Sequence, residues 1–130
     1  MKQTYDVVVL GAGPTGENLA DIVVRGGLTA ALVEAELVGG ECSYWACMPS
    51  KALLRGTEAL ADARAVDGAA QAVTGEQDVA ATLERRTTFT SNWDDSGQVS
   101  WVEGAGITLV RGSGRLDGEK TVVVTGADGA

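Results

Sequence analysis

Two cysteines five positions apart, Cys42 and Cys47, are the residues of this sequence best suited to covalent chemistry. Such a pair can be a structural cross-link, half of a metal site or a redox-active dithiol. On a regular helix their Cα atoms would lie ~8.6 Å apart, whereas a disulfide bond needs a separation of ~4.4–6.8 Å. We therefore expect an irregular turn between them. Pro49 supplies a cause, because it cannot donate a hydrogen bond to the carbonyl of Trp45 and its ring crowds that carbonyl.

The surroundings of the two cysteines favour the redox dithiol over the other two possibilities. A bridge closed in distorted geometry is easier to reduce, and the amino end of a helix stabilises the attacking thiolate. Two thiolates would leave a zinc ion short of ligands, since the sequence has no histidine and no further cysteine. Lys51 follows by about one helical turn and can face the same cavity, although this spacing is also compatible with a plain solvated lysine.

A glycine-rich turn near the start of the chain could hold phosphate groups. Gly11, Gly13 and Gly16 of the segment GAGPTG follow a β-branched run and precede a helix-compatible stretch. In a dinucleotide fingerprint the first glycine makes the tight turn, the second lets backbone approach the pyrophosphate, and the third allows close packing of helix on strand. Glu34 ends the next apolar run, 23 residues after Gly11, where a carboxylate can accept the hydroxyls of a ribose. The plainer interpretation is a structural turn with a solvated glutamate.

The elements that must position these residues follow from periodicity and from glycine and proline. Buried strands are expected at 5–10, 29–34 and 107–110, a further strand at 121–125, and helices at 17–25, 52–65, 76–89 and 94–103. Loops or turns are expected at 38–41, 67–75 and 111–115, with a hairpin turn at Asp117-Gly118. The first strand, glycine turn, helix and second strand form a βαβ unit. The sequence therefore predicts an α/β fold, with a Rossmann-like parallel sheet and a β-hairpin segment near the carboxyl end.

Composition limits the classes of function. The chain has 130 residues, 45% of them hydrophobic, so one folded core is expected. The formal net charge of -8 and the lack of a Lys or Arg cluster argue against a nucleic-acid partner. No apolar stretch approaches the ~20 residues of a membrane span, and no secretory signal opens the sequence. A cytoplasmic protein is the resulting expectation, and there disulfides are more often catalytic than structural.

Taken together, these motifs resemble one known family. The family pattern GGxCxNxGCxPSK is matched by positions 39–51 (GGECSYWACMPSK) at both glycines, both cysteines, the proline, the serine and the lysine. With GAGPTG and Glu34, this segment resembles the class I pyridine nucleotide–disulfide oxidoreductases, which include dihydrolipoamide dehydrogenase, mercuric reductase and glutathione reductase. The segment VRGSGRL at 110–116 is similar to the family segment whose backbone meets the flavin adenine. The resemblance covers the whole chain.

The resemblance implies a flavin enzyme. Cys47 would sit against FAD and exchange electrons with it, Cys42 would attack a substrate disulfide, and Lys51 would lie near the reactive flavin nitrogen. NAD(P)H would be the co-substrate that delivers hydride to the opposite face of the flavin. The residues that the resemblance assigns to FAD binding are Gly11, Gly13, Pro14, Thr15, Gly16, Glu34, Gly40, Glu41, Lys51, Ser113 and Gly114.

The resemblance also implies which parts of such an enzyme lie elsewhere. Residues 1–130 correspond to the amino-terminal part of the family's FAD-binding domain. The NAD(P)-binding domain, the dimerisation domain and a late His–Glu acid–base pair are expected outside them. We therefore expect the whole protein to be a homodimer, and residues 1–130 alone to be inactive.

The segment between the cysteines departs from the family pattern. Tyr44 and Ala46 stand where the family has Asn and Gly, and Trp45 is bulkier than the usual small aliphatic residue. The reaction class is unaffected, because both redox cysteines are kept. The favoured substrate is a dithiol, disulfide or lipoyl-type molecule, as in a dihydrolipoamide dehydrogenase. Reduction of mercuric ion or of a low-molecular-weight disulfide is the alternative. A nucleotide-binding module with an idle dithiol is the alternative of another class.

The remaining tryptophans and a basic pair are expected to be structural. Trp93 and Trp101 are predicted to anchor a core or an interface, whereas Trp45, between the cysteines, is expected near cofactor or substrate. The pair Arg85-Arg86 is predicted to lie on a solvated helix face. No metal site is expected.

Overall fold

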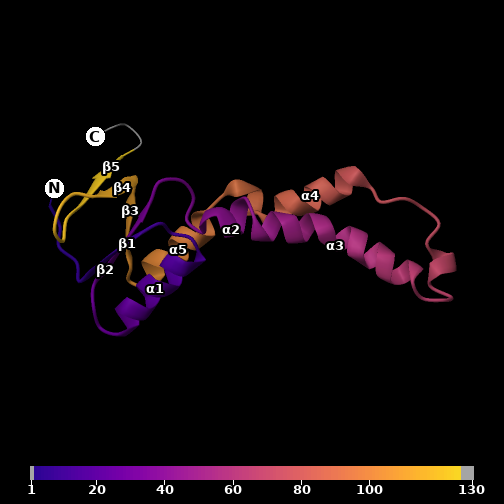
Figure 1. The fold of residues 1–130 in the computed structure, drawn as a ribbon, viewed down its shortest axis with the longest axis horizontal. Coiled ribbons are helices and arrows are strands. Elements are labelled where there is room, and N and C mark those ends of the chain that lie inside the picture. Colours follow the sequence, from indigo (N-terminus) through magenta and orange to yellow (C-terminus); the bar gives the residue numbers. More distant parts are fainter. Residues whose placement is uncertain (1, 127–130) are drawn as a thin grey trace. The chain divides into compact units, whose positions relative to one another are not determined.

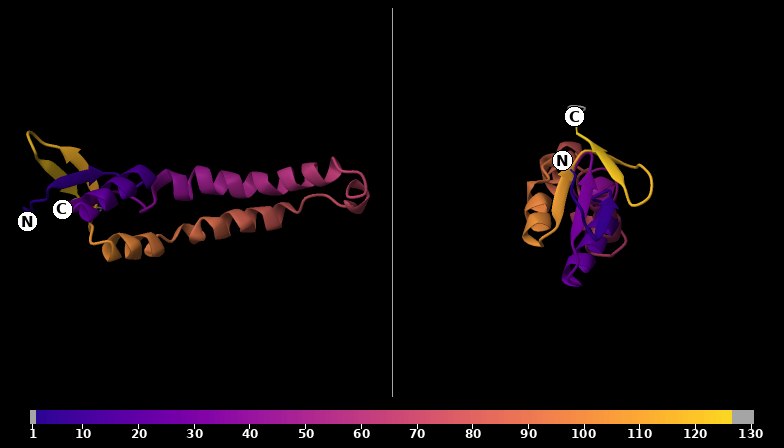
Figure 2. Two further views of the ribbon diagram at one scale, coloured as in Figure 1. Left: turned by 90° about the horizontal axis from the view of Figure 1, so that it is seen from below. Right: turned by 90° about the vertical axis from the view of Figure 1, so that its left-hand side faces the viewer.

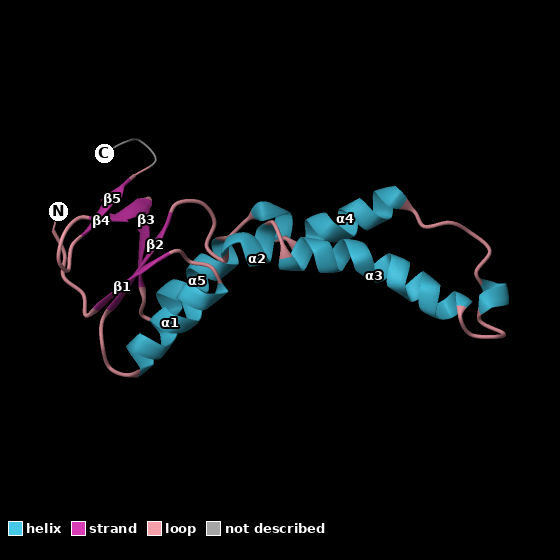
Figure 3. Ribbon diagram, viewed as in Figure 1, coloured by secondary structure: helices cyan, strands magenta, loops and turns pink. Residues whose placement is uncertain are grey.

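A computed structural model of the chain describes residues 2–126, which form two units (Figures 1 and 3). The first, which we call the sheet unit, comprises the residues up to Cys42 together with those from Asp94 onward. The second, which we call the helical unit, comprises Ser43–Trp93. All strands of the described residues belong to the sheet unit.

Three parallel strands form the centre of the sheet unit. β1 (Val7–Leu10) pairs with β2 (Ala30–Glu34), and β2 pairs with β3 (Thr108–Arg111), which gives the order β1-β2-β3. α1 (Pro14–Arg25) crosses from β1 to β2, and α5 (Ser96–Gly104) leads into β3. This arrangement confirms the predicted βαβ start and the Rossmann-like parallel sheet.

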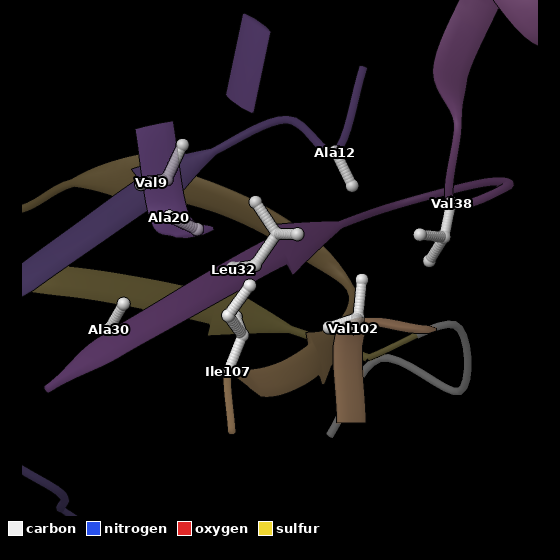
Figure 4. Close-up of a cluster of buried hydrophobic side chains, with 8 residues drawn as sticks. All are labelled: Val9, Ala12, Ala20, Ala30, Leu32, Val38, Val102 and Ile107. Carbon is white, nitrogen blue, oxygen red and sulfur yellow. The ribbon is translucent and has the colours of Figure 1, made fainter. Parts of the chain in front are cut away.

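The core of the sheet unit lies between the helices and one face of the sheet (Figure 4). Side chains alternate between faces along a strand, and Val9 of β1 and Leu32 of β2 lie on the helix side. There they join Ala20 of α1 and Val102 of α5 in one buried cluster. β2 is buried along nearly its whole length, as its continuous apolar run predicts for a central parallel strand.

An antiparallel hairpin follows the parallel sheet. β4 (Ser113–Leu116) pairs with β5 (Val122–Thr125), so the predicted hairpin is present. The prediction of a tight turn over 111–115 is wrong in part, because residues from Ser113 onward form β4. The bend lies at Gly112, whose φ of 145° only glycine adopts readily. Pairing with the apolar β5 outweighs the low strand propensity of the Ser-Gly-Arg segment.

The hairpin packs on the face of the sheet opposite the helices. A Cβ atom placed on Gly114 would lie 2.7 Å from Leu10 Cδ2 and 3.0 Å from Val33 Cγ1. Gly114 therefore lets β4 approach the sheet at a distance that a side chain would prevent.

Two helices of the helical unit lie alongside each other and run antiparallel (Figure 2). They are α3 (Cys47–Arg64) and α4 (Val79–Phe89), and the segment between them includes the short 3-10 helix η1 (Ala70–Ala72). A second 3-10 turn, η2 (Ser91–Trp93), follows α4. The short helix α2 (Gly40–Tyr44) precedes α3 in the chain.

Local chemistry explains where α3 and α4 begin. α3 starts five residues earlier than predicted, because Pro49 lies in its first turn, where a backbone N–H is not needed. α4 starts three residues later than predicted. There the Asp78 carboxylate caps the helix by accepting a hydrogen bond from the Ala81 N–H at 3.0 Å.

One carboxyl group lies among the buried residues of the sheet unit. Glu17 of α1 is 8% exposed, and Gln98 Nε2 of α5 donates a hydrogen bond to its Oε1 at 3.3 Å. Burial removes the carboxylate from water, and this desolvation raises the pKa of Glu17 above its ordinary value of 4.5. The folded protein therefore holds this proton at pH values where the unfolded chain has already released it.

The substitution Glu17→Gln should stabilise the fold at neutral pH. Because the pKa is raised in the folded state, the free energy of unfolding falls as pH rises above about 4.5. The amide introduced at this position keeps an acceptor for Gln98 and removes the charge. Urea unfolding at pH 7 should therefore show the variant to be more stable than the wild type, and the difference should shrink as pH falls below about 4.5.

Glu103→Gln is the matched control, because Glu103 is an exposed glutamate on α5. Its effect on stability should be small at both pH values. If Glu17→Gln changed the free energy of unfolding by the same amount at pH 4 and pH 7, burial of the charged carboxylate would not be the cause of its effect.

Candidate functional site

The turn after β1 has the geometry of a phosphate-binding loop. Gly11 has a φ of 96°, and its N–H donates to the Val33 carbonyl of β2 at 2.8 Å. A Cβ atom on Gly16 would lie 2.0 Å from the Gly11 carbonyl oxygen, so the third glycine is needed for α1 to pack against the turn. These are the tasks that the sequence predicts for the first and third glycines.

The amino end of α1 is open to an anion. Its N-cap, Gly13, has no side chain with which to cap the helix, and Pro14 occupies the first turn. The first N–H groups of a helix have no intrahelical acceptor, and α1 is 12 residues long, so its dipole adds a partial positive charge there. Thr15 is exposed at this end. The backbone can therefore hold a phosphate group.

Glu34 lies directly beside this loop. Its Oε2 accepts a hydrogen bond from the Ala12 N–H at 2.7 Å, and its Oε1 accepts one from the Glu36 N–H at 2.8 Å. An ionised carboxylate has about four acceptor positions, so further hydroxyl donors can bind. The position at the end of β2 agrees with the sequence prediction. The bond to Ala12, which the sequence did not predict, also fixes the loop itself.

The two glycines that open the cysteine motif pack against the same loop. Gly39 N–H donates to the Ala12 carbonyl at 2.7 Å. Gly40 has a φ of 59°, and a Cβ atom there would lie 2.8 Å from Gly13 Cα. Glu41, the next residue, is exposed in the first turn of α2. The glycine pair therefore brings the start of the motif into backbone contact with the phosphate loop.

A pocket of about 430 Å³ opens beyond Glu34. It is formed by the chain after β2, the start of α5, and the ends of β3 and β5, with residues Ala35, Glu36, Leu37, Asp95, Arg111, Gly112, Ser113, Thr125 and Gly126. Of the predicted pair Ser113 and Gly114, Ser113 lines this pocket, whereas Gly114 meets Leu10 and Val33 of the sheet.

An ion pair shapes the wall of the pocket. Arg111 Nη2 lies 2.6 Å from Asp95 Oδ2, and Arg111 Nη1 donates to the Glu36 carbonyl at 2.6 Å. The same Asp95 oxygen accepts from the Val38 N–H at 2.8 Å. Together these bonds hold the chain between Glu34 and Gly39. Sequence analysis missed them, because Asp95 lies far from residues 36–38 in the chain and no spacing rule links them.

The backbone between the two cysteines is irregular, as the sequence predicts. α2 ends at Tyr44 and α3 begins at Cys47, while Ala46 has φ of -122° and ψ of -89°, outside the helical region. The Ala46 carbonyl accepts from Ser50 N–H at 3.0 Å and from Ser50 Oγ at 2.6 Å. Cys42 and Cys47 are both half-buried.

Lys51 lies on the same side of α3 as Cys47. The two residues are four positions apart in a regular helix, which places them one turn from each other. The Lys51 side chain is exposed.

Residues 2–126 contain neither a membrane-spanning helix nor a cluster of metal-binding side chains. None of the helices there is long and apolar enough to cross a lipid bilayer. The described residues also hold no group of three or more His, Cys, Asp or Glu side chains placed to bind a metal ion.

Curated proteins similar to this chain are dihydrolipoyl dehydrogenases. The enzyme of Chlamydia muridarum is 34% identical over 127 residues, which cover 97% of this chain and 27% of that protein. Dihydrolipoyl dehydrogenase 3 of Pseudomonas aeruginosa is 36% identical over 142 residues, or 99% of this chain and 28% of that protein. The chain therefore spans little more than a quarter of the length of these relatives.

A solved structure has a similar fold, and a family model matches the chain. The HOCl-induced flavoprotein disulfide reductase RclA of Escherichia coli has a TM-score of 0.63 and 19% identity, over 84% of this chain and 22% of that one. At that identity the likeness shows the fold alone. The family model for pyridine nucleotide-disulphide oxidoreductases matches residues 5–129. Because that match covers nearly every residue, the chain belongs to the pyridine nucleotide-disulphide oxidoreductase family.

Proposed function

We propose that the protein is an FAD-dependent disulfide oxidoreductase. It would pass electrons from NAD(P)H through the flavin to Cys42 and Cys47, and on to a substrate disulfide. The observation that carries the proposal is the Glu34 carboxylate, bonded on one side to the Ala12 amide of the glycine loop and on the other to the Glu36 amide at the pocket. A bound dinucleotide needs an acceptor for ribose hydroxyls at this point, between a phosphate site and a cavity for a base.

The sheet unit fits the adenosine diphosphate half of FAD. The amides at the start of α1 suit the pyrophosphate, Glu34 suits the ribose, and the 430 Å³ pocket suits the adenine ring. Besides Lys51, the residues proposed to bind FAD are Gly11, Gly13, Pro14, Thr15, Gly16, Glu34, Gly40, Glu41, Ser113 and Gly114. When bound, FAD would supply the two-electron step between NAD(P)H and the dithiol.

The chemistry proposed for the two cysteines is thiol–disulfide exchange. The Cys42 thiolate attacks one sulfur of the substrate disulfide, so that a mixed disulfide forms and one substrate thiolate leaves with its electron pair. The Cys47 thiolate then attacks the Cys42 sulfur, which forms the Cys42–Cys47 disulfide and releases the second substrate thiolate. Two electrons pass from the dithiol to the substrate, and each released thiolate takes up a proton. Two electrons from NAD(P)H, with two protons, restore the dithiol.

Lys51 is proposed to act beside the second cysteine. It lies one turn after Cys47 on α3 and is exposed, so its ammonium group is available to a bound cofactor. A positive charge there would stabilise negative charge on a reduced flavin.

The remaining parts of the proposal concern the whole protein. The NAD(P)H site and the dimerisation surface are proposed to lie outside residues 1–130, in a cytoplasmic homodimer. Because the relatives are named dihydrolipoyl dehydrogenases, a lipoyl-type or other small disulfide or dithiol is the proposed substrate. Mercuric ion and low-molecular-weight disulfides are the alternatives to include in an assay.

Glu34→Ala should lower the affinity for FAD at least about tenfold, because each charge-assisted hydrogen bond to a ribose hydroxyl is worth ~1.5–3 kcal/mol. The measurement is a titration of apoprotein with FAD, followed by quenching of flavin fluorescence. Glu103→Ala, which removes the same charge from an exposed position on α5, should leave the affinity unchanged.

Glu34→Ala removes the proposed acceptor for the ribose, and it also removes the bonds to Ala12 and Glu36 that hold the loop. The stability of the apo variant separates these two effects. Circular dichroism should show a folded protein. Unchanged FAD affinity in a folded variant would mean that Glu34 does not hold the ribose.

The two cysteines should have different roles when each is changed to serine. In Cys47→Ser, the remaining Cys42 should form a stable mixed disulfide with an added small disulfide, which mass spectrometry detects as an adduct. In Cys42→Ser, that adduct should form at least about tenfold more slowly, because Cys47 lies against the flavin. Cys42→Ser should also keep the long-wavelength absorbance of a thiolate beside the flavin, which Cys47→Ser should lose.

Exchange of these two phenotypes would reverse the assignment of attacking and flavin-facing cysteines. If alkylation of both thiols left NAD(P)H-dependent turnover unchanged, the dithiol would be idle and the protein a nucleotide-binding module of another kind.

A further inference from the structure

The turn after α4 has a conformation that needs a compensating interaction. Ser91, Asn92 and Trp93 have φ values of 52°, 55° and 56° in succession. Residues other than glycine seldom adopt this left-handed region, and strain of this kind persists only where surrounding contacts impose it. Contacts with neighbouring residues must therefore hold this turn in its conformation.

Trp93 contacts the segment between the two cysteines. Its indole Nε1–H donates a hydrogen bond to the Tyr44 carbonyl at 3.2 Å. Its ring lies 6.0 Å from the ring of Trp45, with an angle of 30° between the planes. That separation is within the range in which aromatic rings attract each other. One side chain thus engages two successive residues of the segment.

The hydrogen bond lies where the backbone leaves a helix. Tyr44 is the last residue of α2. The next residues, Trp45 and Ala46, do not continue the helix before α3 begins at Cys47. Trp93 therefore fixes the chain at the point where it leaves α2 and turns toward Cys47.

Arg86 supports Trp93 and corrects one expectation from the sequence. Its guanidinium carbon lies 5.2 Å from the centroid of the Trp93 ring, a cation–π distance. Its Nε is buried and has no hydrogen-bond partner among residues 2–126. The prediction that Arg85-Arg86 lies on a solvated helix face is confirmed for Arg85, which is exposed, and wrong for Arg86, which is half-buried against the ring of Trp93.

We propose that Trp93 is a positioning residue for the dithiol, which holds the segment between Cys42 and Cys47 in the conformation in which the disulfide closes. The inference rests on the proposed function of these cysteines. It also accounts for the departure from the family pattern at Trp45, whose large ring supplies the surface that Trp93 contacts. A segment released from Trp93 samples more conformations, so one thiolate meets the other sulfur less often.

The test measures the dithiol itself rather than turnover. The purified flavoprotein is equilibrated with glutathione buffers of graded reduced-to-oxidised ratio, quenched with an alkylating reagent, and scored by mass spectrometry for zero or two alkylated cysteines. Trp93→Phe keeps an aromatic ring and removes the N–H donor. Loss of one hydrogen bond should lower the effective concentration of one thiol for the other roughly two- to tenfold, so the variant's disulfide should be reduced at a correspondingly milder ratio.

Trp101→Phe is the matched control, because Trp101 lies exposed on α5 in the sheet unit. Its disulfide equilibrium should equal that of the wild type. If folded Trp93→Phe and Trp101→Phe had their disulfides reduced at the same glutathione ratio, the proposal would be overturned. If Trp93→Phe does not fold, Trp45→Leu decides: Trp45 is 55% exposed, so this variant should fold. It should shift the equilibrium in the same direction, and the lack of a shift would overturn the proposal.

The same experiment separates this inference from the proposed function. If the wild-type cysteines form no bond with each other in any buffer, the proposed redox role fails. If they form one that Trp93→Phe leaves unchanged, only the positioning role fails.

Discussion

The candidate cofactor site depends on backbone contacts that leave no room for side chains. Gly16 approaches the Gly11 carbonyl so closely that a Cβ atom would lie 2.0 Å from it, and Gly40 approaches Gly13 in the same way at 2.8 Å. The first contact sets α1 directly after β1, so that its amino end faces outward from the carboxyl end of the sheet. The second brings the chain that leads to Cys42 against the same turn. A methyl group at either position would force these segments apart.

This arrangement bears on how an acidic protein would bind the pyrophosphate of the proposed cofactor. The segment GAGPTG contains no Lys or Arg, the formal net charge of the chain is -8, and Arg111, which lines the pocket, is paired with Asp95. Backbone N–H groups and the dipole of α1 must therefore supply the attraction for a phosphate group. Fixed N–H groups also favour one position of the ligand. The two amides that bond to the Glu34 carboxylate offset part of its negative charge beside this loop.

Sequence analysis located the parts of the site that depend on local chemistry. The glycine turn, the glutamate at the end of β2 and the irregular backbone near Pro49 each follow from a few neighbouring residues. The sequence did not predict the features that depend on contacts between residues far apart in the chain. β4 forms because Ser113–Leu116 pairs with β5, although its own residues favour a turn. The bonds from Arg111 and Asp95 to residues 36–38, and the contact of Trp93 with Tyr44, join positions far apart in the chain. Sequence spacing does not reveal such contacts.

The two ways in which this chain reaches positive φ angles have different consequences. At Gly11, Gly39 and Gly40 the residue itself accepts the conformation, so the phosphate loop can form without help from distant contacts. At Ser91 and Trp93 the residue type is not suited to it, although Asn92 accepts it more readily, and the contacts of Trp93 help to maintain the conformation. The turn after α4 and the segment between the cysteines therefore stabilise each other. A change in the conformation of that segment would therefore alter its contact with Trp93. The glycine turn after β1 needs no such distant contact, because its own residues accept its backbone angles.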